Sequence, residues 1–361
     1  MSYTPSGSNQ HTLTRPLREH FPYRKNHLDT LGHVLQATLE GKHVIQQSIA
    51  DRLPGEAQNP SKLRRVERFF STHPLSQHHT ATYLLNSLPD NEKLTFILDR
   101  TNWDLGQTPI NILMLAVLQP STNTALPLCW TTLNHSGNSS TKARVDLLEA
   151  LFHMLPIERI GMLLADREFI GEPWLTFLVE HEVPFTLRIR ENMHLDDIQA
   201  KVWFEDLRSS EVSEVVHDVL LAGLPVWTQA TLSPEGERVI VISSVSDELL
   251  LERYRKRFRI ECLFKNMKSL GFRLENTHMT DPRHLERLVC LLAVVFVWAV
   301  KLGERVHIRK KNHGRLARSV FRVGISLLLE LFRKPLQALL DGLQLLFPRR
   351  CSPGILKLQN W

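Results

Sequence analysis

The order of apolar segments between residues 93 and 190 most constrains the fold of this chain. Three strand-like runs come first, KLTFIL, INILMLAVLQP and ALPLCWTTLN, and the turn PSTNT indicates an antiparallel meander. An amphipathic helix over 142–155 follows, then a buried strand RIGMLLA, a helix GEPWLTFLVEHE and a fifth strand PFTLRIR. This order predicts an α/β (α+β) fold with a mixed sheet flanked by helices.

Two aspartates follow apolar strands of this sheet. Asp99 comes after TFIL in the first strand, and Asp166 comes after GMLLA in the fourth. The order of elements is that of an RNase H-like domain, in which the first and fourth strands lie side by side, so we expect the two carboxylates to be neighbours. A single aspartate at a strand end is usually a turn or cap residue, so a site requires a further group.

That further group is Glu261, the only carboxylate in the basic stretch YRKRFRIECLFKNMK at 254–268. On a helix at about 100° per residue, Tyr254, Arg257, Glu261 and Lys268 fall within an arc of roughly 60°. The same spacing also fits a solvated face with salt bridges. Three gathered carboxylates would repel one another unless a cation compensates, and an oxygen-rich site suits Mg²⁺.

The spacing Tyr-x2-Arg-x3-Glu-x6-Lys resembles the YREK signature of bacterial transposases of the insertion-sequence-four family. The resemblance extends into GFRLENTHMTDPRHLERL and covers residues 90 to 325 well. It implies a DDE triad of Asp99, Asp166 and Glu261 that holds two Mg²⁺ ions, with Mn²⁺ as a substitute, for phosphoryl transfer. It also implies phosphate contacts from three further residues, Tyr254, Arg257 and Lys268. Glu168 is not expected to be a ligand.

The resemblance implies a DNA transposase that binds terminal inverted repeats, cleaves at the element ends and transfers 3′ ends to target DNA. The partners would be double-stranded DNA and a second protomer in a synaptic complex, in a bacterial cytoplasm at the nucleoid. Two alternatives stay open: a domesticated copy that binds DNA without cutting it, and an RNase H-like Mg²⁺ nuclease. The intact triad disfavours the first, and the YREK face disfavours the second.

The runs HDVLLAGLPVWTQATL and GERVIVISSV have the pattern of short strands. They predict that residues 191–246 form a β-rich insertion before the Glu261 helix. Relatives that close a DNA hairpin carry a tryptophan at the start of the strand before that helix, where this chain has Val239. Trp227 and Trp203 are the nearest aromatic residues that could stack on a base, and Trp227 is our candidate. A core role fits both tryptophans as well.

We expect residues 1–90 to form an N-terminal helical DNA-binding region, which begins with a loose tail over residues 1 to about 25. A helix over 27–39 is followed by VIQQSIADRL and SKLRRVERFF, and Ser61 is the predicted N-cap of the last helix. Four cations of this helix are candidates for phosphate contacts: Lys62, Arg64, Arg65 and Arg68. A helical bundle with a solvated basic face fits the same pattern.

The remaining boundaries and the composition complete the expectations. Residues 91–190 and 247–310 form the two parts of the catalytic domain, and 311–361 form a basic helical C-terminal segment. The apolar run 288–300 has about 13 residues against about 20 for a bilayer span, so no membrane segment is expected. The chain has 44 Lys and Arg against 38 Asp and Glu, and the excess lies near 251–275 and 301–322. Such concentrated charge predicts a polyanionic partner, although the second segment could also contact a protomer.

Overall fold

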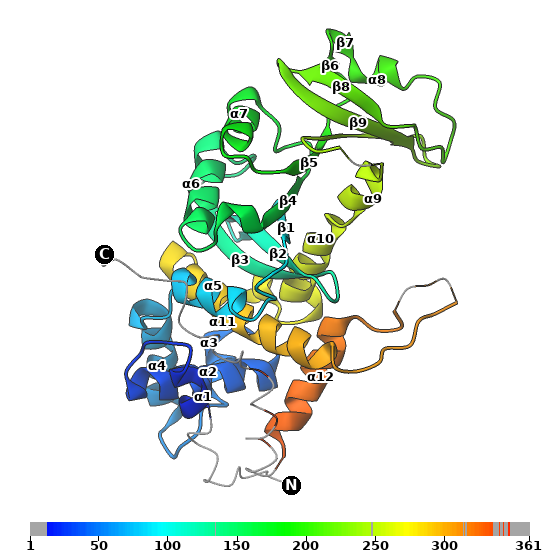
Figure 1. Cartoon of the computed structure of the whole chain (residues 1–361). Coiled ribbons are helices and arrows are strands. Elements are labelled where there is room, and N and C mark those ends of the chain that lie inside the picture. Colours follow the sequence, from blue (N-terminus) through cyan, green and yellow to red (C-terminus); the bar gives the residue numbers. More distant parts are fainter. Residues whose placement is uncertain are drawn as a thin grey trace.

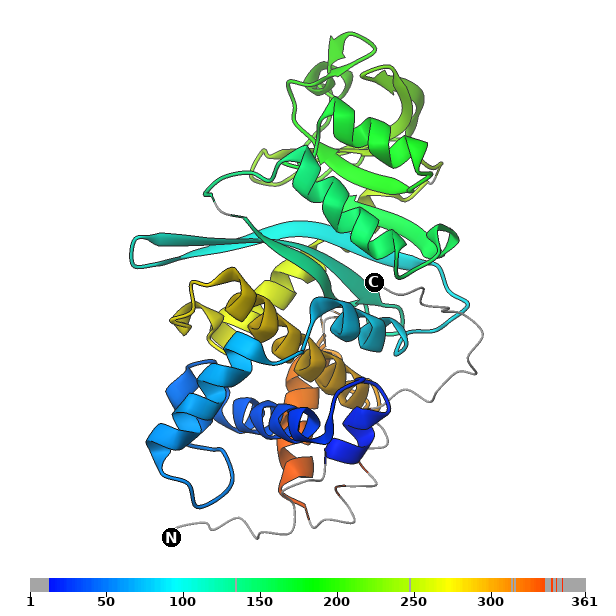
Figure 2. The same ribbon diagram turned by 90° about the vertical axis from the view of Figure 1, so that its left-hand side faces the viewer.

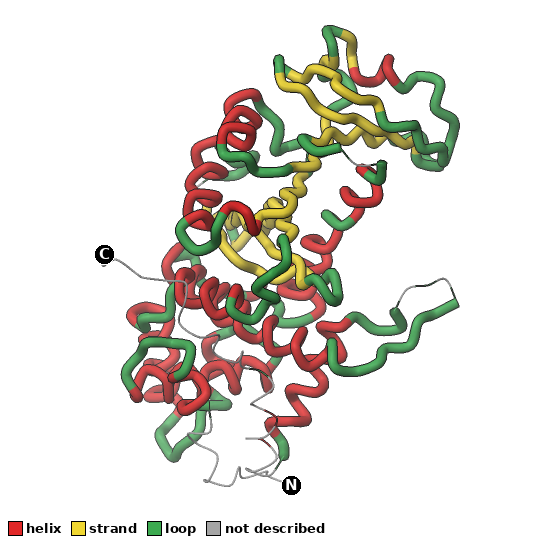
Figure 3. The backbone as a smooth tube through the Cα atoms, in the orientation of Figure 1, coloured by secondary structure: helices red, strands yellow, loops and turns green. Residues whose placement is uncertain are grey.

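The computed structural model describes residues 13–133, 135–246, 248–312, 314 and 316–334, together with 339, 342 and 346. A helical region, a central mixed sheet and a β-rich region follow one another along the molecule (Figures 1 and 3). The predicted α/β class is confirmed. Residues 1–12 and most of the chain after residue 334 lie outside the described residues. The loose tail expected over residues 1 to about 25 is wrong for its described part, because Thr14–Arg18 is helical and Leu13, Leu17 and Phe21 are buried in the core.

The predicted meander is confirmed. Strand β1 (Leu94–Leu105) pairs antiparallel with β2 (Thr108–Gln119), which pairs antiparallel with β3 (Thr124–Leu133). One expectation is wrong: Asp99 lies inside β1, not at its end. The strand continues because every residue from Asp99 to Leu105 still pairs with β2, and the pairing ends only at Leu105 opposite Thr108.

The parallel half of the sheet also follows the prediction. Helix α6 (Thr141–Phe152) leads through the short helix η1 (Ile157–Arg159) to β4 (Ile160–Ala165), and helix α7 (Glu172–Glu180) leads to β5 (Phe185–Ile189). Strand β4 pairs parallel with both β1 and β5. Figure 2 shows α6 and α7 on one side of the sheet and α5 and α11 on the other. The sheet is therefore buried on both faces, as its continuous apolar strands require.

The expected insertion is rich in strands and continues the same sheet. Strands β8 (Val216–Leu221), β9 (Leu224–Leu232) and β10 (Arg238–Ser243) extend it to eight strands in the order β3-β2-β1-β4-β5-β10-β9-β8. The insertion also holds β6 (His194–Leu195), β7 (Ile198–Gln199) and α8 (Ala200–Trp203). Strand β10 pairs with β5 of the catalytic half, so the insertion is joined to it by backbone hydrogen bonds.

The single helix expected over 254–268 is wrong. The stretch forms α9 (Leu250–Arg255), α10 (Phe258–Lys265) and a π-helical segment Asn266–Leu270. Between α9 and α10, the N–H of Arg257 donates to Tyr254 O over 2.8 Å, three residues back, as in a tight turn. The two halves pack differently: α9 joins a small cluster with Trp227, Val239 and Val241, whereas α10 packs into the main core.

Two helices follow α10 and pack against each other. Helix α11 (Pro282–Gly303) is buried along most of its length, and α12 (Val320–Phe332) packs against it. A short helix η3 (Leu274–Asn276) precedes α11. Although α11 is strongly apolar, no helix in the described part of the chain meets the length and hydropathy that a bilayer span requires.

The N-terminal region is helical, as predicted. It contains α1 (Thr14–Arg18), α2 (Lys25–Gly41), α3 (Gln46–Ala50), α4 (Asn59–Thr72) and α5 (Gln77–Leu85). The predicted N-cap at Ser61 is wrong, because the N-cap of α4 is Gln58, three residues earlier. Pro60 occupies the first turn, where a missing N–H does no harm.

Candidate active site

Strand pairing brings Asp99 and Asp166 together. Leu98 of β1 is paired with Ala165, the last residue of the parallel strand β4, and an aspartate follows each of these two residues. Oδ1 of Asp99 accepts from the N–H of Arg100 over 2.8 Å, and Oδ1 of Asp166 accepts from the N–H of Arg167 over 2.8 Å. Each carboxylate is thus oriented by the backbone that follows it, and the predicted neighbourhood of the two acids is confirmed.

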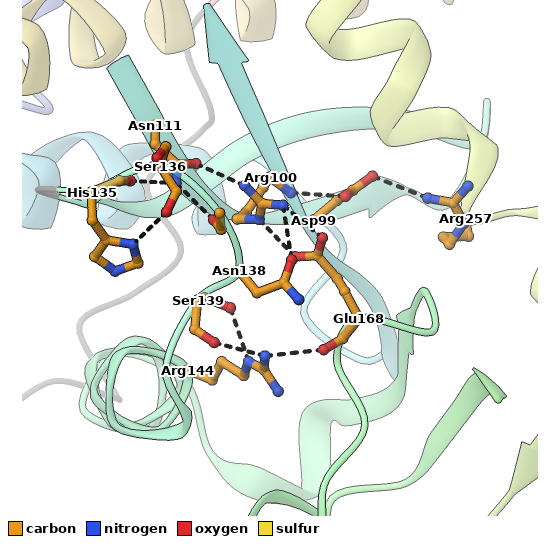
Figure 4. Close-up of polar contacts among 11 residues, drawn as sticks. Asp99, Arg100, Asn111, His135, Ser136, Asn138, Ser139, Arg144, Glu168 and Arg257 are labelled. Carbon is orange, nitrogen blue, oxygen red and sulfur yellow. Dashed lines mark hydrogen bonds and ion pairs between the residues drawn. The ribbon is translucent and has the colours of Figure 1, made fainter. Parts of the chain in front are cut away.

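Arg257 lies between Asp99 and Glu261. Its Nη1 is 3.0 Å from Oδ2 of Asp99, and its Nη2 binds Oε1 of Glu261. Figure 4 shows this guanidinium aimed at the Asp99 carboxylate. Tyr254 completes the group, because its hydroxyl donates to Oδ1 of Asp166 over 3.1 Å. Three residues of the predicted signature therefore gather around the two aspartates, although the helix that carries them is broken.

Lys268 lies further along β1. Its Nζ donates to the carbonyl of Asn102 over 2.7 Å, lies 3.0 Å from Oε1 of Glu275 and sits 5.5 Å from the ring centroid of Trp103. The lysine is thus held beside the segment of β1 that extends past Asp99. It belongs to the same edge of the site but touches none of the three acids.

Burial dominates the electrostatics of Asp99. It raises the pKa of this carboxyl to about 6, against the opposing effect of Arg257 and with smaller contributions from Glu168 and Asp166. Burial also raises the pKa of Tyr254 well above its usual range, so its hydroxyl stays a donor. Burial opposes the charge of Arg257, but the surrounding oxygens outweigh it and raise the pKa of its guanidinium.

A second polar cluster, around Arg100 and Glu168, lies next to the two aspartates. It was not identified from the sequence. Nε of Arg100 lies 2.7 Å from Oε1 of Glu168 and Nη2 lies 2.8 Å from Oε2, a bidentate pair that links β1 to the loop after β4 (Figure 4). Nη1 of Arg100 also reaches Asn111 on β2 over 3.2 Å. The available signal was that Arg100 and Glu168 each lie within two residues of a candidate aspartate.

The buried residue Arg144 extends this cluster to α6. Its Nη2 donates to the carbonyl of Glu168 over 3.0 Å and to the carbonyl of Ser139 over 2.8 Å, and its Nε donates to Ser139 Oγ over 2.9 Å. Asn111 holds the same loop through the carbonyls of His135 and Gly137 at 2.9 and 3.0 Å. The loop before α6 and the loop after β4 are therefore fixed to the strand that carries Asp99.

The acids fit a divalent cation only in part. Asp99 and Asp166 offer adjacent carboxylate oxygens, which suit Mg²⁺, and a buried carboxylate gains from a cation beside it. Among the described residues, however, no three acidic, histidine or cysteine side chains lie close enough together to hold a metal ion. The guanidinium of Arg257 stands between Asp99 and Glu261, so the third acid is separated from the pair by a cation of the chain itself.

The other predicted DNA contacts lie elsewhere. Trp227 is half-buried on β9 and packs in the cluster that includes Tyr254, and Trp203 donates its indole N–H to the carbonyl of Leu195 over 3.0 Å. On α4, Arg64 and Arg68 are exposed, whereas Arg65 is half-buried and contacts His33 over 3.0 Å. Lys62 is partly exposed. Contact with DNA by any of these residues stays a prediction.

Comparison with known proteins agrees with this geometry. The family described as "Transposase DDE domain" matches residues 90–298, a range that contains all three acids. The piggyBac transposase in a synaptic complex with hairpin DNA shares the fold with a TM-score of 0.50 and 11% identity, over 96% of this chain and 83% of that one. Its likeness establishes the RNase H-like fold alone.

A second solved structure, an endonuclease V from Bacillus subtilis, matches 66% of this chain and 92% of that one at 11% identity. Its TM-score of 0.28 is too low to support a comparison. No curated protein matches the sequence.

Proposed function

Because this chain belongs to the transposases with a DDE domain, we propose that it moves a bacterial insertion sequence by cutting and pasting it. The proposed reaction cleaves at the terminal inverted repeats and joins the 3′ ends to target DNA. The observation that carries the proposal is the gathering of Tyr254 and Arg257 around Asp99 and Asp166, with Glu261 bound to the same arginine. These contacts fit the YREK signature of the insertion-sequence-four family.

Asp99, Asp166 and Glu261 are the proposed ligands of two Mg²⁺ ions, for which Mn²⁺ could substitute. When bound, the ions would activate a water or 3′-hydroxyl for in-line attack and stabilise the leaving oxygen. The chain's own residues set the conditions for this. Because the pKa of Asp99 is about 6, its carboxyl is mostly ionised above that pH and can then take part in a metal site. Arg257 has to release Asp99 and Glu261 before the three acids can share a cation.

Arg257 and Tyr254 would then turn to the DNA. In this structure Arg257 donates to the carboxylates of Asp99, over 3.0 Å, and of Glu261, and Tyr254 donates to the carboxylate of Asp166 over 3.1 Å. Once cations neutralise those carboxylates, a guanidinium fork and a phenol hydroxyl become available beside the acids, and a phosphate matches that fork geometrically. Lys268 would add a point charge further along β1. Metal binding and the grip on DNA would therefore be linked through the same two side chains.

The hairpin step depends on the insertion. Val239 is the second residue of β10, at the position where hairpin-forming relatives have a tryptophan, and Trp227 lies on the adjacent strand β9 in the same small cluster. We propose Trp227 as the substitute that stacks on a flipped base, an interaction of about 1–3 kcal/mol. The piggyBac complex holds hairpin DNA, which makes hairpin detection a natural assay here.

The test uses linear duplexes that carry the DNA flanking this gene, purified protein, and either Mg²⁺ or EDTA. The proposal predicts metal-dependent nicking at the repeat boundary and a product of slow denaturing-gel mobility if a hairpin closes. A Trp227→Ala variant should nick normally and lose the hairpin product. Specific binding without any cutting would instead favour a domesticated DNA-binding protein. A protein that neither binds nor cuts these duplexes would refute the proposal.

A further inference from the structure

A basic arm, residues 305–318, connects α11 to α12. It contains six Lys and Arg (Arg305, Arg309, Lys310, Lys311, Arg315 and Arg318) and no Asp or Glu. The rest of the chain has 38 Lys and Arg against 38 Asp and Glu, so it is neutral on balance. The whole net charge of +6 is therefore equal to the charge of this one segment.

The arm stands out from the body of the protein. Figure 1 shows it as an orange loop that projects on the side where α9 and α10 lie. Arg305, Arg309, Lys310 and Lys311 are all exposed, and none of them is paired with a carboxylate among the described residues. In contrast, Arg257 and Arg100 are engaged with acids inside the site. The arm thus holds a concentration of positive charge that no carboxylate among the described residues compensates.

The described residues of the arm form a hairpin. Lys310 and Leu316 form an antiparallel bridge, and the N–H of Ala317 donates to the carbonyl of Arg309 over 2.8 Å. At its base, Ile308 packs against the core, and Arg318 donates to Ser326 Oγ of α12 over 3.1 Å. The arm therefore presents its cations from a rooted hairpin, which lowers the entropy lost on binding.

The two ends of the arm meet. A Cβ on Gly303 would lie 2.2 Å from the carbonyl oxygen of Val320, so the last residue of α11 touches the first residue of α12. The segment leaves the core and returns to the same place, and nearly all of its described residues are exposed. A much shorter segment could connect the helices, and the arm does not fill the core. We therefore infer that its charge binds an external partner.

We propose that the basic arm binds the phosphate backbone of duplex DNA, outside the cleavage site, without reading sequence. Duplex DNA carries one negative charge per about 1.7 Å of helix, so it matches a cluster of unpaired cations. A second copy of this chain offers no such match, because its body is neutral on balance and its own arm would repel. The inference rests on the proposed function, since it adds a contact to the same DNA.

The experiment measures binding of full-length protein to a random-sequence duplex of roughly 30 base pairs by fluorescence anisotropy over a series of salt concentrations. The arm variant carries Arg305→Gln, Arg309→Gln, Lys310→Gln and Lys311→Gln. The control variant neutralises four exposed cations outside the arm and outside the predicted N-terminal DNA-binding region: Lys93→Gln, Lys201→Gln, Arg208→Gln and Lys334→Gln. A third protein replaces residues 305–318 by a short Gly-Ser linker, which the contact between Gly303 and Val320 permits.

We expect the arm variant to flatten the slope of log K against log salt by roughly 0.9 for each phosphate that the arm no longer neutralises, up to about 3.6, and to weaken binding about tenfold or more. The linker protein should behave like the arm variant and keep the wild-type unfolding temperature. The control should keep most of the wild-type slope. Nicking of the element ends by the arm variant at low salt should persist, because the arm lies outside the acids.

An arm variant with the wild-type salt slope would overturn the inference, as would an equal loss in the control variant. A wild-type slope accompanied by a smaller mass in light scattering would also overturn it and assign the arm to a protomer interface. Failure of the proposed function looks different: the wild type would then neither bind the duplex nor nick the element ends in Mg²⁺.

Discussion

Arg257 and Asp99 are 158 positions apart in the sequence, yet Nη1 of the arginine lies 3.0 Å from Oδ2 of the aspartate. The same guanidinium binds Glu261 four residues further on. One cation of the chain therefore compensates two of the three acids that we propose as metal ligands. A buried carboxylate left without any cation would favour its protonated form, so this contact keeps the site ready for a metal but also competes with it.

Replacing the competing cation should strengthen metal binding by the DNA-free protein. We expect Arg257→Gln to bind Mn²⁺ about tenfold more tightly at about pH 8, where Asp99 is charged, and to cleave DNA more slowly because no guanidinium then binds the phosphate. Electron paramagnetic resonance of free Mn²⁺ measures the affinity. Arg238→Gln, which removes a cation paired with Glu191 over 3.3 Å, is the matched control. Weaker Mn²⁺ binding by Arg257→Gln would show that the arginine positions the acids rather than competing for them.

The pair Arg100–Glu168 should act as a clamp on the two aspartate-bearing segments. We expect Arg100→Gln and Glu168→Gln each to lower the free energy of unfolding, and their double-mutant cycle to give a coupling of about 1–3 kcal/mol, because the pair is bidentate and partly buried. Urea unfolding of the four proteins gives the coupling. The cleavage rate should fall about 10- to 100-fold in each single variant, as for residues that orient ligands. Additive losses of stability would show that the pair does not act as a clamp.

The strand order was predictable because each strand of the central sheet is an apolar run bounded by turn residues. The neighbourhood of Asp99 and Asp166 followed from it. The break between α9 and α10 was not predictable, since the helical spacing of Tyr254, Arg257 and Glu261 is intact. The break arises from packing against two separate clusters, which no local pattern encodes. The role of Glu168 was missed for a related reason: its partner Arg100 becomes adjacent only when β1 and β4 pair.

Acid should destabilise the N-terminal helices through His73. Burial lowers the pKa of this histidine from its usual 6.5 to about 4. Its Nδ1 accepts from the N–H of Leu75 over 3.0 Å, and its Nε2 faces the carbonyl of His27 over 3.0 Å, so the folded protein holds the neutral ring. The unfolded chain takes up the proton first, so stability is complete above pH 6.5 and is lost as the pH falls towards 4, by roughly 3 kcal/mol.

The check is the free energy of unfolding by urea at intervals over this pH range. His73→Gln keeps a donor and an acceptor but cannot titrate, so its stability should depend less steeply on pH. Equal pH dependence in the wild type and the variant would show that other groups cause the acid loss.

A methyl group at Gly324 should destabilise the protein, because α11 and α12 are in close contact at this residue. A Cβ there would lie 1.6 Å from the carbonyl oxygen of Ala299, so the helices would have to separate. An exposed helical Gly→Ala change usually stabilises by about 1 kcal/mol, whereas we expect Gly324→Ala to destabilise by about 3 kcal/mol or more. Gly171→Ala is the control, since it has no atom within 4 Å of the added methyl. Thermal unfolding compares them, and a Gly324→Ala protein as stable as the wild type would contradict the packing.

The central claim is that Asp99, Asp166 and Glu261 ligate the catalytic metal. The most direct measurement is a metal switch at Asp166, by nicking of element-end duplexes with Asp166→Cys in Mg²⁺ and in Mn²⁺, beside Asp166→Ser. A thiolate binds softer cations better than Mg²⁺, so we predict that Asp166→Cys loses nicking in Mg²⁺ and recovers part of it in Mn²⁺, while Asp166→Ser stays inactive in both. Wild-type nicking in Mg²⁺ by Asp166→Cys, or no recovery in Mn²⁺ by a variant that still folds and binds DNA, would contradict the assignment.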